Sequence, residues 1–319
     1  MVLIVLPRAH ARRGFVEDRK AACSVVDPSG SSPSPGSSQL HALSIGPRMR
    51  VAKSPGGTLV GRVIAVCNQK GGVAKTTTVV SLGAALADLG KKVLLVDLDP
   101  QGGLTVCSGF DPDSLQKTVY DALRRGESAS GCVLRTQFGP DLVPANIDLS
   151  MAEMELIGMV ARERRLGAVL GPVRDDYDFV LMDCQPSLGL LAINALAFAD
   201  EVLIPVACEA LALRGARILL RVIGKVRVQL NSKLKITGVL PTMYDARTNH
   251  GKRILEEIKS SFQGKIRVFE TVINRSVRFA EAAGEGKPVF LHAGAVPGAQ
   301  AYRELALEVA GAEARHAGA

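Results

Sequence analysis

The chain contains 319 residues, of which 47% are hydrophobic and 22% charged, and it carries a formal net charge of +8. This length allows one or two domains with a large core, and the composition excludes wholesale disorder. Its longest apolar runs are much shorter than the roughly 18 residues that a membrane-spanning helix needs, which argues against an integral membrane protein. The positive charge is concentrated in residues 202–280, which hold 15 Lys and Arg against 5 Asp and Glu. A polyanionic partner and a merely solvated basic face both fit this segment.

The six cysteines are spread along the chain, and no two of them are closer than 24 residues. No CxxC pair is therefore present for a zinc or redox site, and scattered thiols favour the reducing cytoplasm over a disulfide framework. The six positions are Cys23, Cys67, Cys107, Cys132, Cys184 and Cys208.

Residues 1–60 differ in composition from the rest of the chain. Ser and Pro cluster in the run DPSGSSPSPGSS, at residues 27–38. Such a segment buries too little apolar surface to offset the entropy lost on ordering, so we expect a disordered extension over 1–60. The opening MVLIVLP is shorter than a signal-peptide core and follows no basic residue, so secretion is not expected. Met49 offers an alternative start of translation, which would leave residues 1–48 untranslated.

From Arg62 onward, short apolar strands alternate with helical stretches. In chain order, the expected strands are Arg62–Asn68, Lys92–Asp97, Tyr177–Asp183, Glu201–Val206 and Ile236–Thr242. The expected helices are Lys75–Leu89, Leu115–Leu123 (followed by a short hairpin), Leu149–Val169, Leu188–Phe198, Leu211–Leu230, Gly251–Phe262 and Ala299–Ala310. This alternation is typical of an α/β fold in which a mostly parallel sheet is flanked by helices on both faces. We expect one domain over residues 61–312 and a flexible tail over 313–319.

The residues after the first expected strand are typical of a phosphate-binding turn. In the run NQKGGVAKTT (residues 68–77), the glycines expose successive backbone N–H groups, and the helix that follows adds its positive end. Lys75 places a charge near the outer phosphates, and Thr76 offers a hydroxyl to Mg²⁺. The strict pattern G-x-x-x-x-G-K-[ST] is not met, because Gln69 and Ala74 occupy its two Gly positions. On spacing alone, an ordinary Gly-rich turn is the alternative.

The run KGGVAKTT resembles the deviant P-loop of the ParA/MinD ATPases, in which Lys70 is the second, signature lysine. Four later segments resemble further motifs of that superfamily, the last two those of the Soj branch of chromosomal ParA proteins. They are VLLVDLDPQGG (93–103), FVLMDCQPSLG (179–189), TMYDARTNHG (242–251) and INRSVRFAEA (273–282). The resemblance covers about Arg62 to Leu307. It implies the deviant-Walker P-loop NTPase fold, with ATP and Mg²⁺ as cofactors.

The resemblance also implies roles for individual residues. The phosphates would be held by Lys70, Gly71, Gly72, Val73, Ala74, Lys75, Thr76 and Thr77. Mg²⁺ would be held by Thr76, Asp97, Asp99 and Asp183. Asp99 would also orient the attacking water. Lys70 would reach the nucleotide of a second subunit, so that hydrolysis by Lys70, Lys75 and Asp99 would depend on dimerisation.

Three positions depart from the family pattern. Ala74 stands where Gly is common. We expect a negative φ there, so that the methyl group is tolerated, whereas a positive φ would cost about 1–2 kcal/mol. Gln185 and Asn274 each replace a common Pro. Gln185 would add a polar group near the metal. With Asn in place of Pro at position 274, the loop around it need not have the conformation common in the family.

Basic residues in the later part of the chain predict contacts to DNA phosphates. By resemblance, Arg247 and Arg278 match positions with which the family holds DNA nonspecifically, and Arg275 lies beside the second of them. A further set forms a stripe at helical spacing, namely Arg214, Arg217, Arg221 and Lys225. This stripe fits either a solvated helix face or a phosphate-binding surface. No helix-turn-helix or zinc-finger pattern is present, so binding should be sequence-independent and salt-dependent.

The resemblance implies a chromosome- or plasmid-partitioning ATPase. An ATP-bound homodimer would coat the nucleoid in the cytoplasm and leave it when a ParB-like partner stimulates hydrolysis. A membrane-cycling ATPase like MinD is the alternative, but residues 299–319 contain more Glu than Arg, so no stable membrane association is expected. An iron–sulfur reductase like the nitrogenase iron protein would need cluster cysteines, and neither Cys132 nor Cys184 sits in such a motif.

Overall fold

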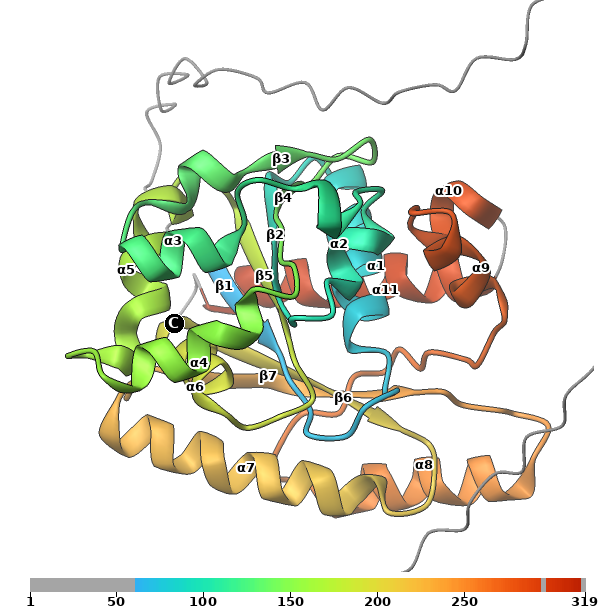
Figure 1. Cartoon of the computed structure of the whole chain (residues 1–319). Helices are drawn as coiled ribbons and strands as arrows, with labels where there is room; N and C mark the ends of the chain where they lie inside the picture. Colours follow the sequence, from blue (N-terminus) through green and yellow to red (C-terminus); the bar gives the residue numbers. More distant parts are fainter. Residues whose placement is uncertain (1–60, 294–296, 317–319) are drawn as a thin grey trace, which may run out of the picture. The chain divides into compact units, whose positions relative to one another are not determined.

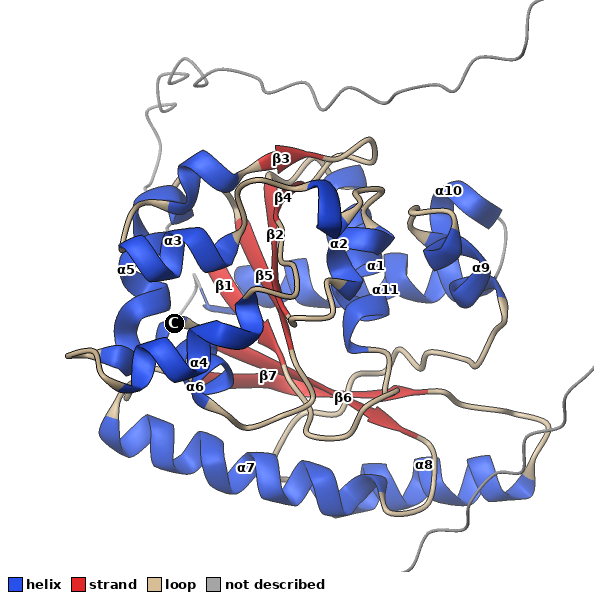
Figure 2. Cartoon of the chain, in the orientation of Figure 1, coloured by secondary structure: helices blue, strands red, loops and turns tan. Residues whose placement is uncertain are grey.

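The computed structural model describes residues 61–293 and 297–316, so the extension expected over 1–60 lies outside the described residues. Seven strands form one sheet in the order β3-β4-β2-β5-β1-β6-β7 (Figure 2). All neighbouring strands are parallel except β3 and β4, which confirms both the mostly parallel sheet and the short hairpin. The strands are β1 Arg62–Val66, β2 Val93–Leu98, β3 Leu134–Arg135, β4 Asp141–Val143, β5 Phe179–Cys184, β6 Glu201–Ala207 and β7 Lys235–Thr242.

Helices cover both faces of the sheet (Figure 1). The core on one face is built with α3 Val119–Arg125, α4 Leu149–Ile157, α5 Arg165–Arg174, α6 Leu190–Phe198, α7 Ala212–Gln229 and α8 Asn249–Phe262. The core on the other face is built with α1 Lys75–Asp88, α2 Gly103–Cys107, α9 Arg278–Gly284, α10 Val289–Ala293 and α11 Pro297–His316. Strands buried between two helical layers read as continuous apolar runs, which is why the sequence identifies them. Within the described residues, no helix combines the length and the apolar character needed to cross a bilayer.

The order of the strands makes the carboxyl end of β1 a topological switch point. This strand lies between β5 and β6, and the helix that follows it, α1, packs on the opposite face from α6, which follows β5. Where connections leave to opposite faces, the loops after neighbouring strands separate, and ligands of open parallel sheets bind in the resulting crevice. The fold therefore points to the carboxyl ends of β1, β5 and β2 as the site.

The structure corrects one expected helix and extends another. The continuous helix expected over Leu149–Val169 is two helices, α4 and α5, separated by a turn. Gly158 ends α4, and Ala161 has a left-handed φ of 54°, which no α-helix accommodates. The apolar periodicity runs across the break because both helices pack on the same core. At the C-terminal end, α11 continues past residue 312, the boundary expected for the domain.

Candidate nucleotide-binding site

The turn between β1 and α1 is fixed from two sides. Asn68 donates its amide to the Pro205 carbonyl at 2.6 Å and accepts a hydrogen bond from the Lys70 backbone N–H at 3.0 Å. On the other side, the Thr242 hydroxyl donates to the Val73 carbonyl at 3.1 Å. Gly72 has a φ of 71°, which glycine adopts without steric strain. The backbone N–H groups of residues 71–76 are therefore held in place before any phosphate binds.

Ala74 contradicts the negative φ expected from the sequence. Its φ is 64° and its ψ 33°, the left-handed conformation, at the residue immediately before α1. In this conformation the Cβ lies too close to the following carbonyl oxygen, a clash that costs about 1–2 kcal/mol for a non-glycine residue. The expectation was wrong because the chain must reverse sharply between the turn and the helix, and side-chain identity does not relax that requirement.

Ala74→Gly is therefore expected to stabilise the protein. The substitution removes the left-handed strain from the folded state. Glycine also raises the conformational entropy of the unfolded chain, which offsets part of this effect, so the free energy of unfolding should rise by about 1 kcal/mol. Urea unfolding of the nucleotide-free protein measures the change. Ala84→Gly, in the interior of α1, is the matched control and should destabilise by at least about 0.5–1 kcal/mol. Equal losses of stability in both variants would contradict the strain at Ala74.

The two lysines of the turn point to different partners. Lys75, the first residue of α1, is almost fully buried, and its Nζ donates to the Lys70 carbonyl at 3.2 Å. The Lys70 Nζ instead pairs with Oε2 of Glu209 at 2.8 Å. The other oxygen of Glu209 accepts a hydrogen bond from Arg275 at 2.9 Å. The Lys70 ammonium is the main reason why the pKa of Glu209 lies below its ordinary value. Sequence reasoning missed Glu209, because it belongs to no recognisable motif and lies far along the chain.

Asp97 and Asp183 face each other as register neighbours at the ends of β2 and β5. Burial and the neighbouring Asp97 carboxylate raise the pKa of Asp183 to about 8, and burial raises that of Asp97 to about 6. The hydrogen bonds of Asp97 hold the next segment: one oxygen accepts from the Asp99 N–H at 3.1 Å, and the other from the N–H and hydroxyl of Thr105 at 2.9 and 2.8 Å. Asp97 thus anchors the loop that carries Asp99. Thr105 was not predicted from the sequence.

Asp183 has the geometry of a metal-binding carboxylate. Its Oδ2 accepts a hydrogen bond from the Thr76 hydroxyl at 2.6 Å, which brings the two predicted metal ligands together. Its Oδ1 is buried and has no hydrogen-bond partner among the described residues. An unpaired buried oxygen beside a hydroxyl, next to a second carboxylate, is the donor set that Mg²⁺ prefers, directly or through water. The residues present therefore fit Mg²⁺, whose charge would also offset the repulsion between the two aspartates.

Asp99 and Gln185 lie at the edges of this site. Asp99 is half-buried, and its Oδ1 accepts a hydrogen bond from the Gln101 N–H at 3.0 Å. Gln185 does not direct its amide to the metal position, because its Nε2 donates to Oε1 of Glu153 in α4 at 3.1 Å. Thr77 is half-buried in the first turn of α1. The polar group that Gln185 adds therefore serves the packing of α4.

Each arginine predicted to bind DNA pairs with a carboxylate of this chain. Arg247 is 89% exposed and forms two hydrogen bonds of 2.9 Å with Asp245. These bonds lower the pKa of Asp245 to about 2. Arg278 pairs with Glu281 at 2.9 Å, and Arg275 pairs with Glu209. Asn274, which replaces a common Pro, precedes Arg275. It forms an isolated parallel bridge with Tyr244, two residues beyond the end of β7.

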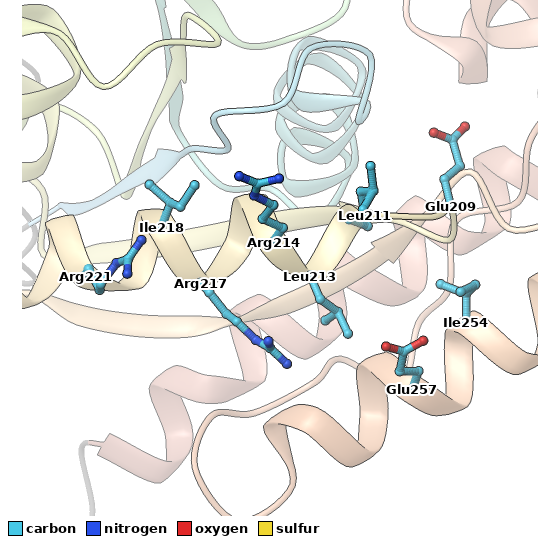
Figure 3. A pocket seen from close by; sticks show the side chains of 10 residues that line it. Glu209, Leu211, Leu213, Arg214, Arg217, Ile218, Arg221, Ile254 and Glu257 are labelled. Carbon is cyan, nitrogen blue, oxygen red and sulfur yellow. The ribbon is translucent and has the colours of Figure 1, made fainter.

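The basic stripe of α7 is exposed and has no carboxylate of its own. None of its four side chains forms an ion pair with any residue in 61–293 or 297–316; they are Arg214, Arg217, Arg221 and Lys225. Between α7 and α8 runs a groove of about 540 Å³, shown in Figure 3, with Leu213 and Ile254 on its walls and Glu209 at one end. Arg217 extends across the side of this groove. The positive charges of the α7 stripe are therefore less neutralised by neighbouring carboxylates than those of Arg247, Arg275 and Arg278.

The amide-lined turn, the buried lysine and the paired carboxylates define a P-loop ATPase that uses ATP and Mg²⁺. A family model described as an AAA domain matches residues 61–236. The solved structure of cobyrinic acid a,c-diamide synthase from Mycobacterium smegmatis with bound ATP analog and magnesium is 44% identical, with a TM-score of 0.68. The match covers 77% of this chain and 93% of that chain. MinD from Pyrococcus furiosus is 27% identical with a TM-score of 0.66, over 79% of this chain and 99% of MinD.

Curated relatives identify the family of P-loop ATPases to which the chain belongs. The chain is 48% identical over 252 residues to the sporulation initiation inhibitor protein Soj of Bacillus subtilis (strain 168), and this match covers 79% of this chain and 99% of Soj. It is 40% identical over 271 residues to the chromosome partitioning protein ParA of Myxococcus xanthus, over 85% and 95% of the two chains. The chain belongs to the Soj/ParA family of partitioning ATPases.

Proposed function

We propose that this ATPase partitions a chromosome or plasmid by binding DNA nonspecifically as an ATP-bound homodimer in the cytoplasm, and that a ParB-like partner stimulates hydrolysis and release from the nucleoid. The observation that carries the proposal is the divergence of the two lysines of the turn. Lys75 is buried against its own phosphate cradle, whereas Lys70 extends to Glu209 at the surface. Because the Lys70 side chain points away from the phosphate turn of its own subunit, it can exchange its ion pair with Glu209 for one with the phosphates bound to a second subunit.

The residues of one subunit divide the work of hydrolysis. The N–H groups of the turn and Lys75 bind the phosphates, because both supply positive charge at fixed positions. Thr76 and Asp183 would hold Mg²⁺, which would supply positive charge to neutralise the phosphates. Asp99, anchored through Asp97, orients the attacking water and accepts its proton. Lys70 of the second subunit completes the positive charge, so that turnover requires the dimer.

DNA would be held by charge rather than by base recognition. Arg247, Arg275 and Arg278 would exchange their carboxylates for phosphates, and exposed ion pairs of this kind are weak enough for such an exchange. The side chains of the α7 stripe have no ion pair with a described residue to give up before they contact phosphates. Contacts of this kind release counterions, so affinity should fall steeply and linearly with log salt concentration. Two subunits on one duplex double the number of contacts, which links DNA affinity to the ATP-bound dimer.

Arg247→Glu is expected to weaken DNA binding at least about tenfold at moderate salt. The change removes one phosphate contact and adds a repulsive charge beside Asp245, and one lost contact should reduce the salt slope by about 1. Gel retardation with random-sequence duplexes measures both quantities. Arg125→Glu, at the exposed end of α3 in an acidic segment, carries the same charge change and should bind like the unmodified protein. Unchanged binding by Arg247→Glu would remove this arginine from the DNA surface.

The proposal as a whole is tested by DNA retardation with ATP, with ADP and without nucleotide, across a salt series. Binding should be tightest with ATP and should weaken in all three states as salt rises. Equal affinity in the three nucleotide states would contradict a nucleotide-controlled DNA clamp. Recruitment to liposomes with ATP, measured by flotation, would instead support a membrane-cycling ATPase.

A further inference from the structure

One helix presents an apolar face that nothing in the described chain covers. The exposed fraction is 57% for Ile147, 41% for Met151, 70% for Met154, 62% for Ile157 and 98% for Val160. These five residues are called the α4 apolar stripe. Met151, Met154 and Ile157 recur every three positions and so lie along one side of α4, whereas Ile147 and Val160 lie just before and just after the helix. The opposite side of the helix is buried in the core. A row of large exposed apolar side chains is unusual on a monomer surface and marks an interaction site.

The stripe borders the nucleotide site. Glu153, in the middle of α4, accepts hydrogen bonds at 3.1 Å from Gln185 and from the Leu191 N–H, on either side of the loop that follows Asp183. A Cβ at Gly189 would overlap the Glu153 carboxylate, so this loop lies directly against the helix. In Figure 1, α4 lies next to α6, which begins where that loop ends. A body that approaches the loop after β5 therefore also meets α4.

The chemistry of the stripe excludes DNA as its occupant. Residues 147–160 (IDLSMAEMELIGMV) contain no Lys or Arg and three acidic residues. Within the chain, Glu155 accepts a hydrogen bond from the Tyr120 hydroxyl, and Asp148 accepts one from Asn146. An apolar row with acidic neighbours repels phosphates and favours an apolar protein surface.

We propose that the α4 apolar stripe is covered by a second copy of this chain when Mg-ATP is bound. This inference rests on the proposed function, in which Lys70 of one subunit reaches the nucleotide of the other. Such a dimer is two-fold symmetric, so each subunit offers the same patch, and apolar side chains match themselves as partners where charged ones do not. A stable dimer buries about 800 Å² on each subunit, more than lysine–phosphate contacts supply. Met151 and Met154 can adapt their shape to a facing copy.

The test uses the full chain in an Asp99→Ala background, which blocks hydrolysis. Met154→Glu should raise the dissociation constant of the Mg-ATP dimer at least about tenfold, because it would bury an unpaired charge. Sedimentation velocity over a range of protein concentrations measures it. Leu307→Glu, at a side chain 59% exposed on α11 of the other helical layer, should dimerise normally, and so should Met154→Leu. ATP affinity at low protein concentration and thermal unfolding should not change in any of the three.

The outcomes separate this inference from the function on which it rests. If the Asp99→Ala protein with its native stripe stays monomeric with Mg-ATP, both fall. If that protein dimerises and Met154→Glu does so with equal affinity, only the stripe is overturned. The stripe is also overturned as a dimer contact if Met154→Glu dimerises normally but loses stimulation by a DNA-bound activating protein, since it would then be a docking site for the activator.

Discussion

Lys75→Ala should abolish ATP binding. Lys75 is the only side-chain cation that the structure, within its described residues, buries at the amide-lined turn, where its ammonium donates to the Lys70 carbonyl. Charge-assisted hydrogen bonds to phosphate are among the strongest in proteins. We expect at least a hundredfold loss of affinity, or about 2.8 kcal/mol. Titration with a fluorescent ATP analogue in the presence of Mg²⁺ measures it.

Two comparisons make that result interpretable. Lys233→Ala, an exposed lysine remote from the turn, should bind ATP normally. Thermal unfolding of nucleotide-free Lys75→Ala should show a folded protein, so that lost affinity is not lost structure. Because the Lys75 charge lowers the pKa of Asp183, its removal should raise that pKa further. ATP affinity within threefold of the unmodified protein would refute the phosphate cradle.

Asp99→Ala should bind ATP normally yet hydrolyse it at least about a hundredfold more slowly, since positioned general bases contribute about 10²–10⁴ in rate. Asp99 takes no part in the bond between Thr76 and Asp183, so nucleotide affinity should change by less than about threefold. Steady-state phosphate release and nucleotide titration separate the two quantities.

The matched control for Asp99→Ala is Asp113→Ala, an exposed aspartate further along the same connection. Its turnover should equal that of the unmodified protein. With hydrolysis blocked, Asp99→Ala should also accumulate as a dimer with Mg-ATP. Normal turnover in Asp99→Ala would transfer the role of the base to another group.

Much of this fold is legible in the sequence because its signals are local. A strand buried on both faces must be a short apolar run, and a phosphate turn must combine glycines with a lysine at the start of a helix. Both requirements act within about ten residues of chain. The helix expected over Leu115–Leu123 is α3, but it begins only at Val119, because Thr118 and Asp121 form a capping box at its start. The short helices α9 and α10 were not anticipated, because each is too short to show an apolar period.

Contacts between distant segments left no comparable trace. Glu209 meets Lys70 across 139 positions, and Glu153 meets Gln185 across 32, so neither pair follows from spacing. The left-handed φ of Ala74 likewise arises from the path of the chain between β1 and α1. The identity of this residue does not indicate which backbone conformation the fold imposes on it. The error at Ala74 follows from this limit.

The amino-acid order alone determined the class of fold, the glycine-rich turn that leads to Lys75 and Thr76, and the aspartates at the ends of the second and third long strands. Each of these is encoded in a few consecutive residues whose backbone geometry and polarity are set locally. Only the tertiary structure decided that Asp97 and Asp183 share one buried site, that Lys70 and Arg275 share Glu209, and that no described residue covers the apolar side of α4. Those facts depend on which strands are neighbours and which helix faces point outward, and the free energy that selects them is summed over the whole core rather than over any one segment.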